Sequence, residues 1–336
     1  MQNISADRVR LSVAEGQALG EETLRRRGYD VEEARIITDH VMDAALCGYE
    51  YSGLPKILNV TEHPRLKEPR RKIRILHETP VSARMDGGNN NGMVAIYRAV
   101  QVAIAKALEH GFSLVGINSS WTSGRSAYYT ELAARQGLVC VHTASGGHTV
   151  APPGAAAGAT GTNPISFAFP TRDEPFVIDM GSSAYMGSDL QFRARRNEPL
   201  PEGVAIDRDG KPTSDPLQAK WLLPLAGHKG FALALAIQSL GVLGGSATDD
   251  QKAYGYIFIT FKPDLLMPFD EYRRDMSAML AQVKAVKKQP GVTNIRLPSE
   301  NSFATRARLR REGIEIDRKI YEALKAVPEG KLPQPL

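Results

Sequence analysis

Apolar residues recur every three or four positions from Val31 to Ala45, and this spacing predicts one face of an amphipathic helix. Asp30 stands directly before the pattern and is a favourable N-cap residue. A similar pattern precedes it and is interrupted at Arg27–Tyr29. The N-terminal part of the chain is therefore expected to form two helices joined at that point.

The middle of the chain alternates between helical and strand patterns. A long amphipathic segment predicts a helix ending at Gly111, and a buried strand is predicted over Phe112–Ile117. The next segment, "SAYYTELAARQG", predicts a helix that leads into the strand "LVCVHTA". Two further strands are predicted over Ile165–Phe169 and in "PFVIDM". This alternation is typical of an α/β fold.

The second half of the chain places a long polar stretch between its apolar segments. The run from Gly187 to Lys220 is rich in turn-forming residues. "GHKGFALALAIQSLGVLGG" then predicts a buried helix with glycine at its start and end. The charged segment "ATRARLRREGIEIDRKIYEALKAV" predicts an amphipathic helix near the C-terminus.

Composition narrows the class of protein. The 336 residues are 42% hydrophobic, enough for a large core, and a net charge of +5 is too small and scattered to favour nucleic acid as the main partner. No stretch is long and apolar enough for a membrane helix, and the first residues lack the apolar core of a signal peptide. Cys47 and Cys140 are expected to be free thiols, so we expect a cytoplasmic protein without a membrane partner.

Common chemical motifs are missing from the sequence. It contains no GxGxxG after a strand, no GxxxxGK[ST], no GxSxG, and no His/Cys cluster that indicates a metal, so no metal is expected. Three glycine-bracketed polar segments remain: "SSWTSGRSAYY", "SGGHTVAPPGAAAGATGTNP" and "GHKGFAL". Glycines beside hydroxyls and cations suit an anionic ligand, although each segment alone also fits a tight, solvated loop.

Five sequence blocks follow one another along nearly the whole chain: Gly161–Pro170, Phe176–Ser183, Asp207–Pro216, Leu222–Leu235 and Arg296–Ile316. Together they resemble the type-2 malate/L-lactate dehydrogenase family, which includes ureidoglycolate, sulfolactate and 2,3-diketogulonate oxidoreductases and cyclic ketimine reductases. The resemblance implies a mixed α/β architecture whose nicotinamide site is not a Rossmann domain, in agreement with the missing GxGxxG. It also implies a homodimer with the active site near the subunit boundary.

The resemblance further implies how the chain is divided. Residues 1–75 would form an N-terminal helical lobe that packs with a C-terminal helix, 304–336. Residues 76–303 would form a central α/β region that binds cofactor and substrate.

The family's cofactor contacts correspond to a defined set of positions in this chain. NAD or NADP is the expected cofactor, and Arg193, Arg195 and Arg196 are candidates for contact with a 2′-phosphate or are simply solvated. For Asp179 the alternative is a helix cap or turn former, and for Lys229 a solvated side chain. The expected cofactor-binding residues are Ile178, Asp179, Met180, Gly181, Ser182, His228, Lys229, Ser299, Glu300 and Asn301.

The positions that carry catalytic histidines in the family differ here. The family pattern Ser-His-Gly, followed by an arginine, corresponds to Tyr51, Ser52, Gly53 and Lys56. The position of a second common histidine corresponds to Thr122. A serine hydroxyl is far too weak an acid to replace imidazole alone at neutral pH.

Three explanations for these substitutions stay open. His148, in a glycine-rich loop, is a candidate for a relocated imidazole. Alternatively, a protonated cyclic imine needs no proton donor, so Tyr51, Ser52 and Thr122 would only orient it, with Tyr51 as a donor if a lysine lowered its pKa. The third explanation is a paralogue that binds cofactor or ligand without turnover.

The cations of the chain favour the active enzyme. Lys56 and Arg125 are the expected ligands of a substrate carboxylate, Arg125 in bidentate fashion. We therefore predict an NAD(P)-dependent oxidoreductase that transfers hydride between nicotinamide and a small carboxylate-bearing hydroxy or keto acid or cyclic imino acid.

Overall fold

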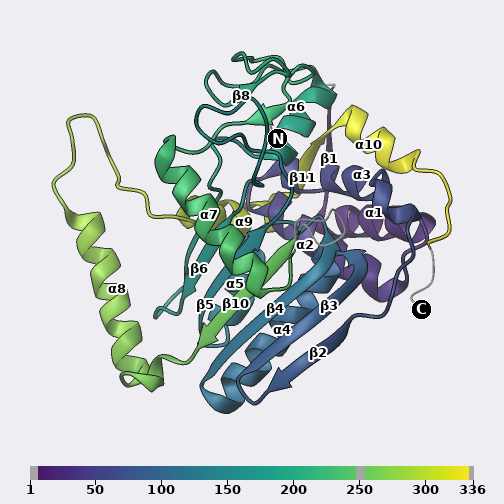
Figure 1. The fold of residues 1–336 in the computed structure, drawn as a ribbon. Helices are drawn as coiled ribbons and strands as arrows, with labels where there is room; N and C mark the ends of the chain where they lie inside the picture. The colour runs from purple at the N-terminus through teal and green to yellow at the C-terminus, as the bar shows by residue number, and fades with distance from the viewer. Residues whose placement is uncertain (1–6, 247–253, 333–336) are drawn as a thin grey trace.

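A computed structural model describes residues 7–246 and 254–332 and is built around a mixed seven-stranded sheet (Figure 1). The strand order is β2-β3-β4-β10-β5-β6-β7, in which β3 and β4 run parallel and all other neighbours run antiparallel. The strands are β2 (Arg74–Thr79), β3 (Ser82–Asn91), β4 (Phe112–Trp121), β5 (Val139–Ser145), β6 (Ile165–Phe169), β7 (Phe176–Met180) and β10 (Gly255–Phe261).

Helices cover both faces of this sheet. On β10, the side chains of Tyr256 and Phe258 join the core formed with α4 (Gly92–His110) and α5 (Ser126–Ala134). Successive side chains of a strand point to opposite faces, so Gly255 faces the other side, where α7 (His228–Leu243) packs. A Cβ on Gly255 would come within 2.3 Å of the Gly241 carbonyl oxygen of α7, so glycine permits this close approach.

The two ends of the described chain meet in a helical lobe. Strand β1 (Arg8–Leu11) pairs antiparallel with β11 (Ile314–Asp317), and α10 packs on α1 and α3. Asp30 accepts a hydrogen bond from the Glu33 backbone N–H, which confirms it as the N-cap of α2. The lobe's helices are α1 (Val13–Arg26), α2 (Val31–Leu46), η1 (Glu50–Ser52), α3 (Pro55–Thr61), η2 (Pro64–Lys67), α9 (Glu300–Glu312) and α10 (Arg318–Lys325).

The predicted single C-terminal helix is wrong in one respect. Gly313 adopts φ +82°, which ends α9, and the alternating residues of β11 then pair with β1 before α10 begins. The expected lobes at 1–75 and 304–336 also include residues 1–6 and 333–336, which lie outside the described ranges.

Other local predictions need correction as well. The polar run that begins at Gly187 opens with a helix, α6 (Gly187–Arg196), before the short strands β8 (Ala205–Ile206) and β9 (Trp221–Leu222). The apolar helix α7 is present but not fully buried, because Leu235 is 47% and Leu243 70% exposed. A further helix, α8 (Phe269–Ala285), follows η4 (Pro263–Leu265) and stands off the body (Figure 1). Among the described residues, no helix combines the length and the apolar character needed to cross a membrane.

Candidate active site

A cleft of about 520 Å³ lies where the helical lobe meets the central sheet. Its walls come from η1, the N-terminus of α5, the end of β7 and the segment before α9. It brings together eight of the residues singled out in the sequence: Tyr51, Ser52, Arg125, Ile178, Asp179, Met180, Gly181 and Ser299. Residues expected to hold the cofactor and residues expected to contact the substrate therefore line one space, which we call the main cleft.

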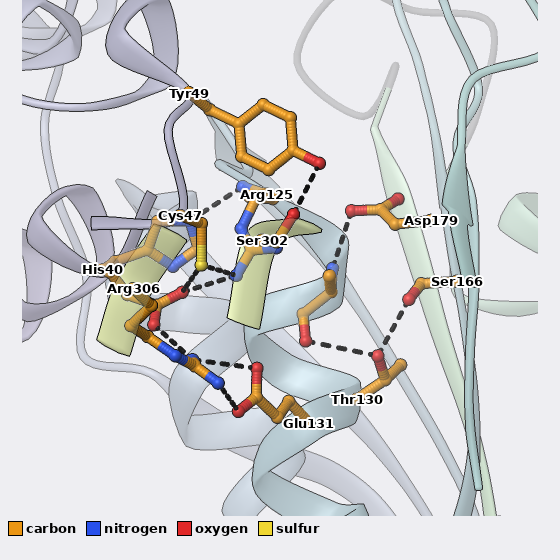
Figure 2. Close-up of polar contacts among 12 residues, drawn as sticks. His40, Cys47, Tyr49, Arg125, Thr130, Glu131, Ser166, Asp179, Ser302 and Arg306 are labelled. Carbon is orange, nitrogen blue, oxygen red and sulfur yellow. Dashed lines mark hydrogen bonds and ion pairs between the residues drawn. The ribbon is translucent and has the colours of Figure 1, made fainter. Parts of the chain in front are cut away.

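Asp179 lies at the end of β7, beside the first turn of α5. Its Oδ2 accepts a hydrogen bond of 2.8 Å from the Ala127 backbone N–H (Figure 2). The positive end of α5 therefore holds the carboxylate in place, as the helix-cap alternative requires. Asp179 is nevertheless exposed along the main cleft, so capping leaves room for a second contact with a ligand.

The residues next to Asp179 give the main cleft an apolar wall. Met180 is 40% exposed and lines the cleft together with Ile178. At Gly181 a Cβ would lie 3.2 Å from the Met186 sulfur, so a larger residue would crowd this wall. Ser299, across the cleft, adopts the left-handed conformation with φ +60°.

A second cavity, of about 590 Å³, adjoins the main cleft. Ser188 of α6 lines both spaces, and the second is also lined by Lys56, Thr122 and Ser123. We call it the Lys56 cavity. Thr122 has φ +59°, which is rare for a β-branched residue, so the turn after β4 is strained. Such strain is concentrated at ligand-binding and catalytic sites, which supports a functional role for this turn.

Lys56, in the first turn of α3, has no counter-charge. No other residue in the described ranges makes an ion pair or hydrogen bond with its side chain. Burial lowers the pKa of its ammonium group to about 8, because desolvation disfavours the charged form. The side chain is therefore a cation that releases its proton close to neutral pH.

The pKa of Tyr51 is shifted away from the near-neutral value that a proton donor needs. Burial, followed by the nearby charge of Asp189, raises the pKa of Tyr51 to about 12, and Arg125 opposes this rise. The hypothesis that a neighbouring lysine activates this phenol therefore finds no support. Tyr51 and Ser52 line the main cleft as hydroxyl groups that can orient a ligand.

Arg125 points its guanidinium group toward the helical lobe. Its Nη2 donates to Asp43 Oδ2 at 2.5 Å, and the guanidinium lies 5.6 Å from the ring centre of Tyr49 (Figure 2). Asp43 in turn accepts from Arg306, which also pairs with Glu131 at 2.5 Å. The expected bidentate clamp on a substrate carboxylate would require Arg125 to leave this ion pair.

Two histidines near the site were not among the predicted site residues. His63 lines the Lys56 cavity, and its ring stacks on Trp121 with the centres 4.3 Å apart. His40, in α2, accepts a hydrogen bond of 2.7 Å from the Arg125 backbone N–H and so supports the turn before α5. No motif surrounds either histidine. The sequence signal for His63 was limited to its position shortly after the helix α3, which contains Lys56.

Three expected cofactor residues lie beside the main cleft without lining it. Ser182 is buried, and its hydroxyl donates to the Thr162 carbonyl oxygen. Glu300 forms an ion pair with Lys284. Asn301 lines a neighbouring cavity behind Ser299.

Three more expected site residues are exposed and line neither the main cleft nor the Lys56 cavity: His148, His228 and Lys229. Their assignments stay predictions. The arginines considered for a 2′-phosphate all have acceptors within the chain, namely Tyr185 for Arg193, Glu62 for Arg195 and Glu198 for Arg196.

The sequence matches the family described as malate/L-lactate dehydrogenase over residues 11–325. The chain belongs to this family. Two curated relatives show its chemical range. An L-sulfolactate dehydrogenase from Methanocaldococcus jannaschii is 30% identical over 321 residues, covering 91% of this chain and 92% of the relative. A Delta(1)-pyrroline-2-carboxylate reductase from Ancylobacter novellus is 31% identical over 342 residues, covering 96% and 98%.

Similar solved structures confirm the fold. A malate dehydrogenase from Pyrococcus horikoshii OT3 superposes with a TM-score of 0.85 at 27% identity, covering 97% of both chains. A delta1-piperideine-2-carboxylate reductase from Pseudomonas syringae pvar. tomato gives 0.80 at 26% identity, covering 95% of this chain and 99% of the other. The predicted mixed α/β architecture is therefore confirmed, and this family member is an enzyme of the dehydrogenase/reductase class.

Proposed function

We propose that this family member uses NAD or NADP to transfer hydride to or from a small carboxylate-bearing substrate, either a hydroxy or keto acid or a cyclic imino acid. One observation supports this above all: the expected cofactor turn at 178–181 and the expected substrate residues of η1 and α5 share the main cleft. The relatives act on both substrate classes, as their names state. The free, buried thiols Cys47 and Cys140 fit a reducing cytoplasm.

The main cleft has the chemistry that a nicotinamide nucleotide needs. The exposed apolar side chain of Met180 offers a surface for the nicotinamide ring, and the carboxyl group of Asp179, whose pKa burial raises, lines the same cleft and can accept a hydrogen bond from a ribose hydroxyl. When bound, the cofactor supplies or accepts the hydride. The chain's own residues position the substrate, balance its negative charge and transfer protons to or from it.

The Lys56 cavity provides complementary groups for the substrate. Lys56 contributes an unpaired positive charge, and Thr122 and Ser123 contribute hydroxyl groups. Thr122 and Gly124 both have positive φ values, and turns of this kind can bind anions through their backbone N–H groups. A small carboxylate that occupies this cavity would face the main cleft across Ser188.

A spectrophotometric screen tests this function. The purified protein is mixed with NADH or NADPH and with keto acids or cyclic imino acids, and the absorbance of the reduced cofactor is followed. We expect turnover of at least one acid, and the responding class identifies the substrate. Cofactor binding, measured by the fluorescence of the reduced nicotinamide, without turnover of any acid would instead support a paralogue that binds without catalysis.

The same screen separates the relocated-histidine hypothesis from the others. Because His148 is exposed and lines neither space, we expect His148→Ala to keep wild-type turnover. His110→Ala, at another exposed histidine at the end of α4, is the matched control. Loss of turnover in His148→Ala alone would return His148 to the catalytic site.

We also propose that the protein is a homodimer. Val242 and Leu243 of α7 are 60% and 70% exposed, and α8 has no buried residue although Met279 and Val283 are apolar. Helix α8 stands off the body of its own subunit (Figure 1). A monomer rarely leaves two helices with such apolar surface uncovered, and a second copy of the chain would bury both.

A further inference from the structure

Lys56 is held where a cation is disfavoured. It lines the Lys56 cavity from the first turn of α3, and burial disfavours its charge. Structural lysines either extend to solvent or pair with a carboxylate. Lys56 instead is half-buried in the wall of the Lys56 cavity and has no charged partner in the described ranges.

The other charged and titratable groups around the Lys56 cavity leave its ammonium group unpaired. Glu62 lines the cavity but is bound at 2.5 Å by Arg195 of α6. On the side of α2, His40 is uncharged because burial lowers its pKa to about 3. Tyr254 lines the far wall, and burial raises its pKa.

The remaining polar groups are poor proton donors at neutral pH. The pKa of Tyr51 is raised to about 12 by burial, so its phenol holds its proton too tightly. The pKa of His63 is lowered to about 4 by burial, so its ring is neutral. A general acid works best when its pKa is near the working pH, and with a pKa of about 8 Lys56 comes closest.

We propose that Lys56 donates the proton to the substrate carbonyl oxygen during reduction, in the role that a histidine would otherwise fill. This inference rests on the proposed oxidoreductase function. As hydride reaches the carbonyl carbon, an N–H bond of the ammonium group breaks and an O–H bond forms on the substrate. The resulting neutral amine regains its proton from water. In the oxidation direction, the neutral amine accepts the hydroxyl proton of the substrate.

This role also selects a substrate class. A protonated imine already carries the positive charge that draws hydride to its carbon, so its reduction needs no donor. A carbonyl oxygen needs a proton as it becomes a hydroxyl group. An unpaired lysine in the substrate cavity is therefore suited to a keto acid and its hydroxy acid.

The first test compares Lys56→Arg with the wild type. Arginine keeps the positive charge and can bind a carboxylate, but it does not release a proton near neutral pH. We expect kcat for keto-acid reduction to fall by about 100-fold or more, while KM changes by less than about threefold. Wild-type kcat should fall as the pH rises through about 8 in reduction and rise over the same range in oxidation, and Lys56→Arg should lose both transitions.

The second test guards against a variant that arginine's size has damaged. Lys56→Ala leaves space for a small amine, so added methylamine should restore part of the lost kcat if a proton donor is all that is missing. Both variants should keep the wild-type affinity for the reduced cofactor, measured by fluorescence.

A third test measures the pKa of the Lys56 ammonium group without any cofactor. Acetic anhydride acylates neutral amines, so the acetylation of Lys56 followed by mass spectrometry against pH reports its pKa. We expect a midpoint near 8 for Lys56, with labelling of the exposed Lys211 as the internal reference.

Three results would overturn the proposal. The first is a Lys56→Arg enzyme with near wild-type kcat and an unchanged pH profile, which would leave Lys56 as a carboxylate ligand. The second is a labelling midpoint above about 10, the ordinary range of lysine. The third is a wild-type protein without turnover of any acid, which would remove the oxidoreductase function and this inference with it.

Discussion

Three histidines of this chain are uncharged at neutral pH. Burial lowers the pKa of His40 to about 3 and the pKa values of His63 and His142 to about 4. Of these, His142 is fully buried on β5, where the centre of its ring lies 4.2 Å from the centre of the Phe258 ring, and the two rings stack. Each of these histidines must gain a proton in the unfolded chain below about pH 6.5, so acid favours unfolding.

We predict an acid-sensitive fold whose sensitivity decreases in His142→Phe. The free energy of unfolding should be highest above about pH 6.5 and should fall as the pH drops toward 4. The reason is that the pKa of His142 in the folded protein lies below its pKa in the unfolded chain. Phenylalanine keeps the stacking but cannot titrate. The decrease in unfolding free energy between pH 6.5 and 4 should therefore be smaller by roughly 3 kcal/mol in the variant. Urea unfolding at several pH values measures it, with the exposed His148→Gln as control. An unchanged pH dependence in His142→Phe would contradict the assignment.

Gly161 opens the block "GTNPISFAFP" and lies against the backbone of another loop. A Cβ at this position would lie 1.7 Å from the carbonyl oxygen of Gly146, so the two loops would have to separate. We predict that Gly161→Ala destabilises the protein by about 3 kcal/mol in urea unfolding. Gly187→Ala, where a Cβ meets nothing within 4 Å, should change stability by less than about 0.5 kcal/mol. Equal effects of the two substitutions would rule out the close approach as the cause.

Sequence reasoning found residues whose role depends on their neighbours in the chain. Asp30 was predictable as an N-cap because capping is local. For Asp179 the sequence left a helix-cap role open, and the structure shows that role, while its part in cofactor binding stays a prediction. The unpaired state of Lys56 and the position of His63 were not predictable. Both depend on which distant segments enclose the Lys56 cavity, and no spacing in one segment encodes that.

Several elements of the fold are joined by one buried ion-pair network. Arg306 of α9 binds Asp43 of α2 and Glu131 of α5, and Asp43 also binds Arg125 (Figure 2). The side chains of Arg306 and Glu131 are 8% and 7% exposed. The network therefore fixes α5, whose N-cap residue Arg125 lines the main cleft, relative to the helical lobe.

We predict that Arg306→Met destabilises the protein by about 3 kcal/mol, because it removes the arginine that two buried carboxylates share and leaves Asp43 with Arg125 and Glu131 with Arg135 as their remaining partners. Arg308→Met is the matched control on the same helix, since Arg308 pairs with Glu312 at the surface and should contribute less than about 1 kcal/mol. Urea unfolding of both variants at neutral pH measures the difference. Similar losses in the two would mean that the network contributes little.

At the scale of elements, the sequence predicted several of those whose apolar pattern faces the chain's own core, although the buried strand β10 was missed. The helix that ends at Gly111 and the strand after it are examples. The strand β11 was missed because it exists only through pairing with β1, at the other end of the chain. Helix α8 was missed because none of its residues is buried, so its pattern matches no core within the subunit.

The whole molecule is predicted to assemble through α7 and α8. Leu243→Glu places a charge on the exposed apolar surface of α7, so we expect it to convert the dimer into monomers of 36.6 kDa in light scattering after size-exclusion chromatography. Leu217→Glu, at a 74% exposed leucine outside these helices, should leave the dimer intact. A wild-type protein that is monomeric at micromolar concentration would contradict the proposal.

The pairing of β1 with β11 has a consequence for how the protein is made. Proteins leave the ribosome N-terminus first, and early segments usually fold as they emerge. Here the first strand has its partner at Ile314–Asp317, and α1 packs on α10, which follows that partner. A nascent chain stalled before residue 314 therefore exposes the surfaces of β1 and α1 that β11 and α10 will later bury. Chaperones can bind these exposed surfaces until β11 and α10 have been made. The segment of β1 and α1 therefore reaches its final structure only after β11 and α10 have been made.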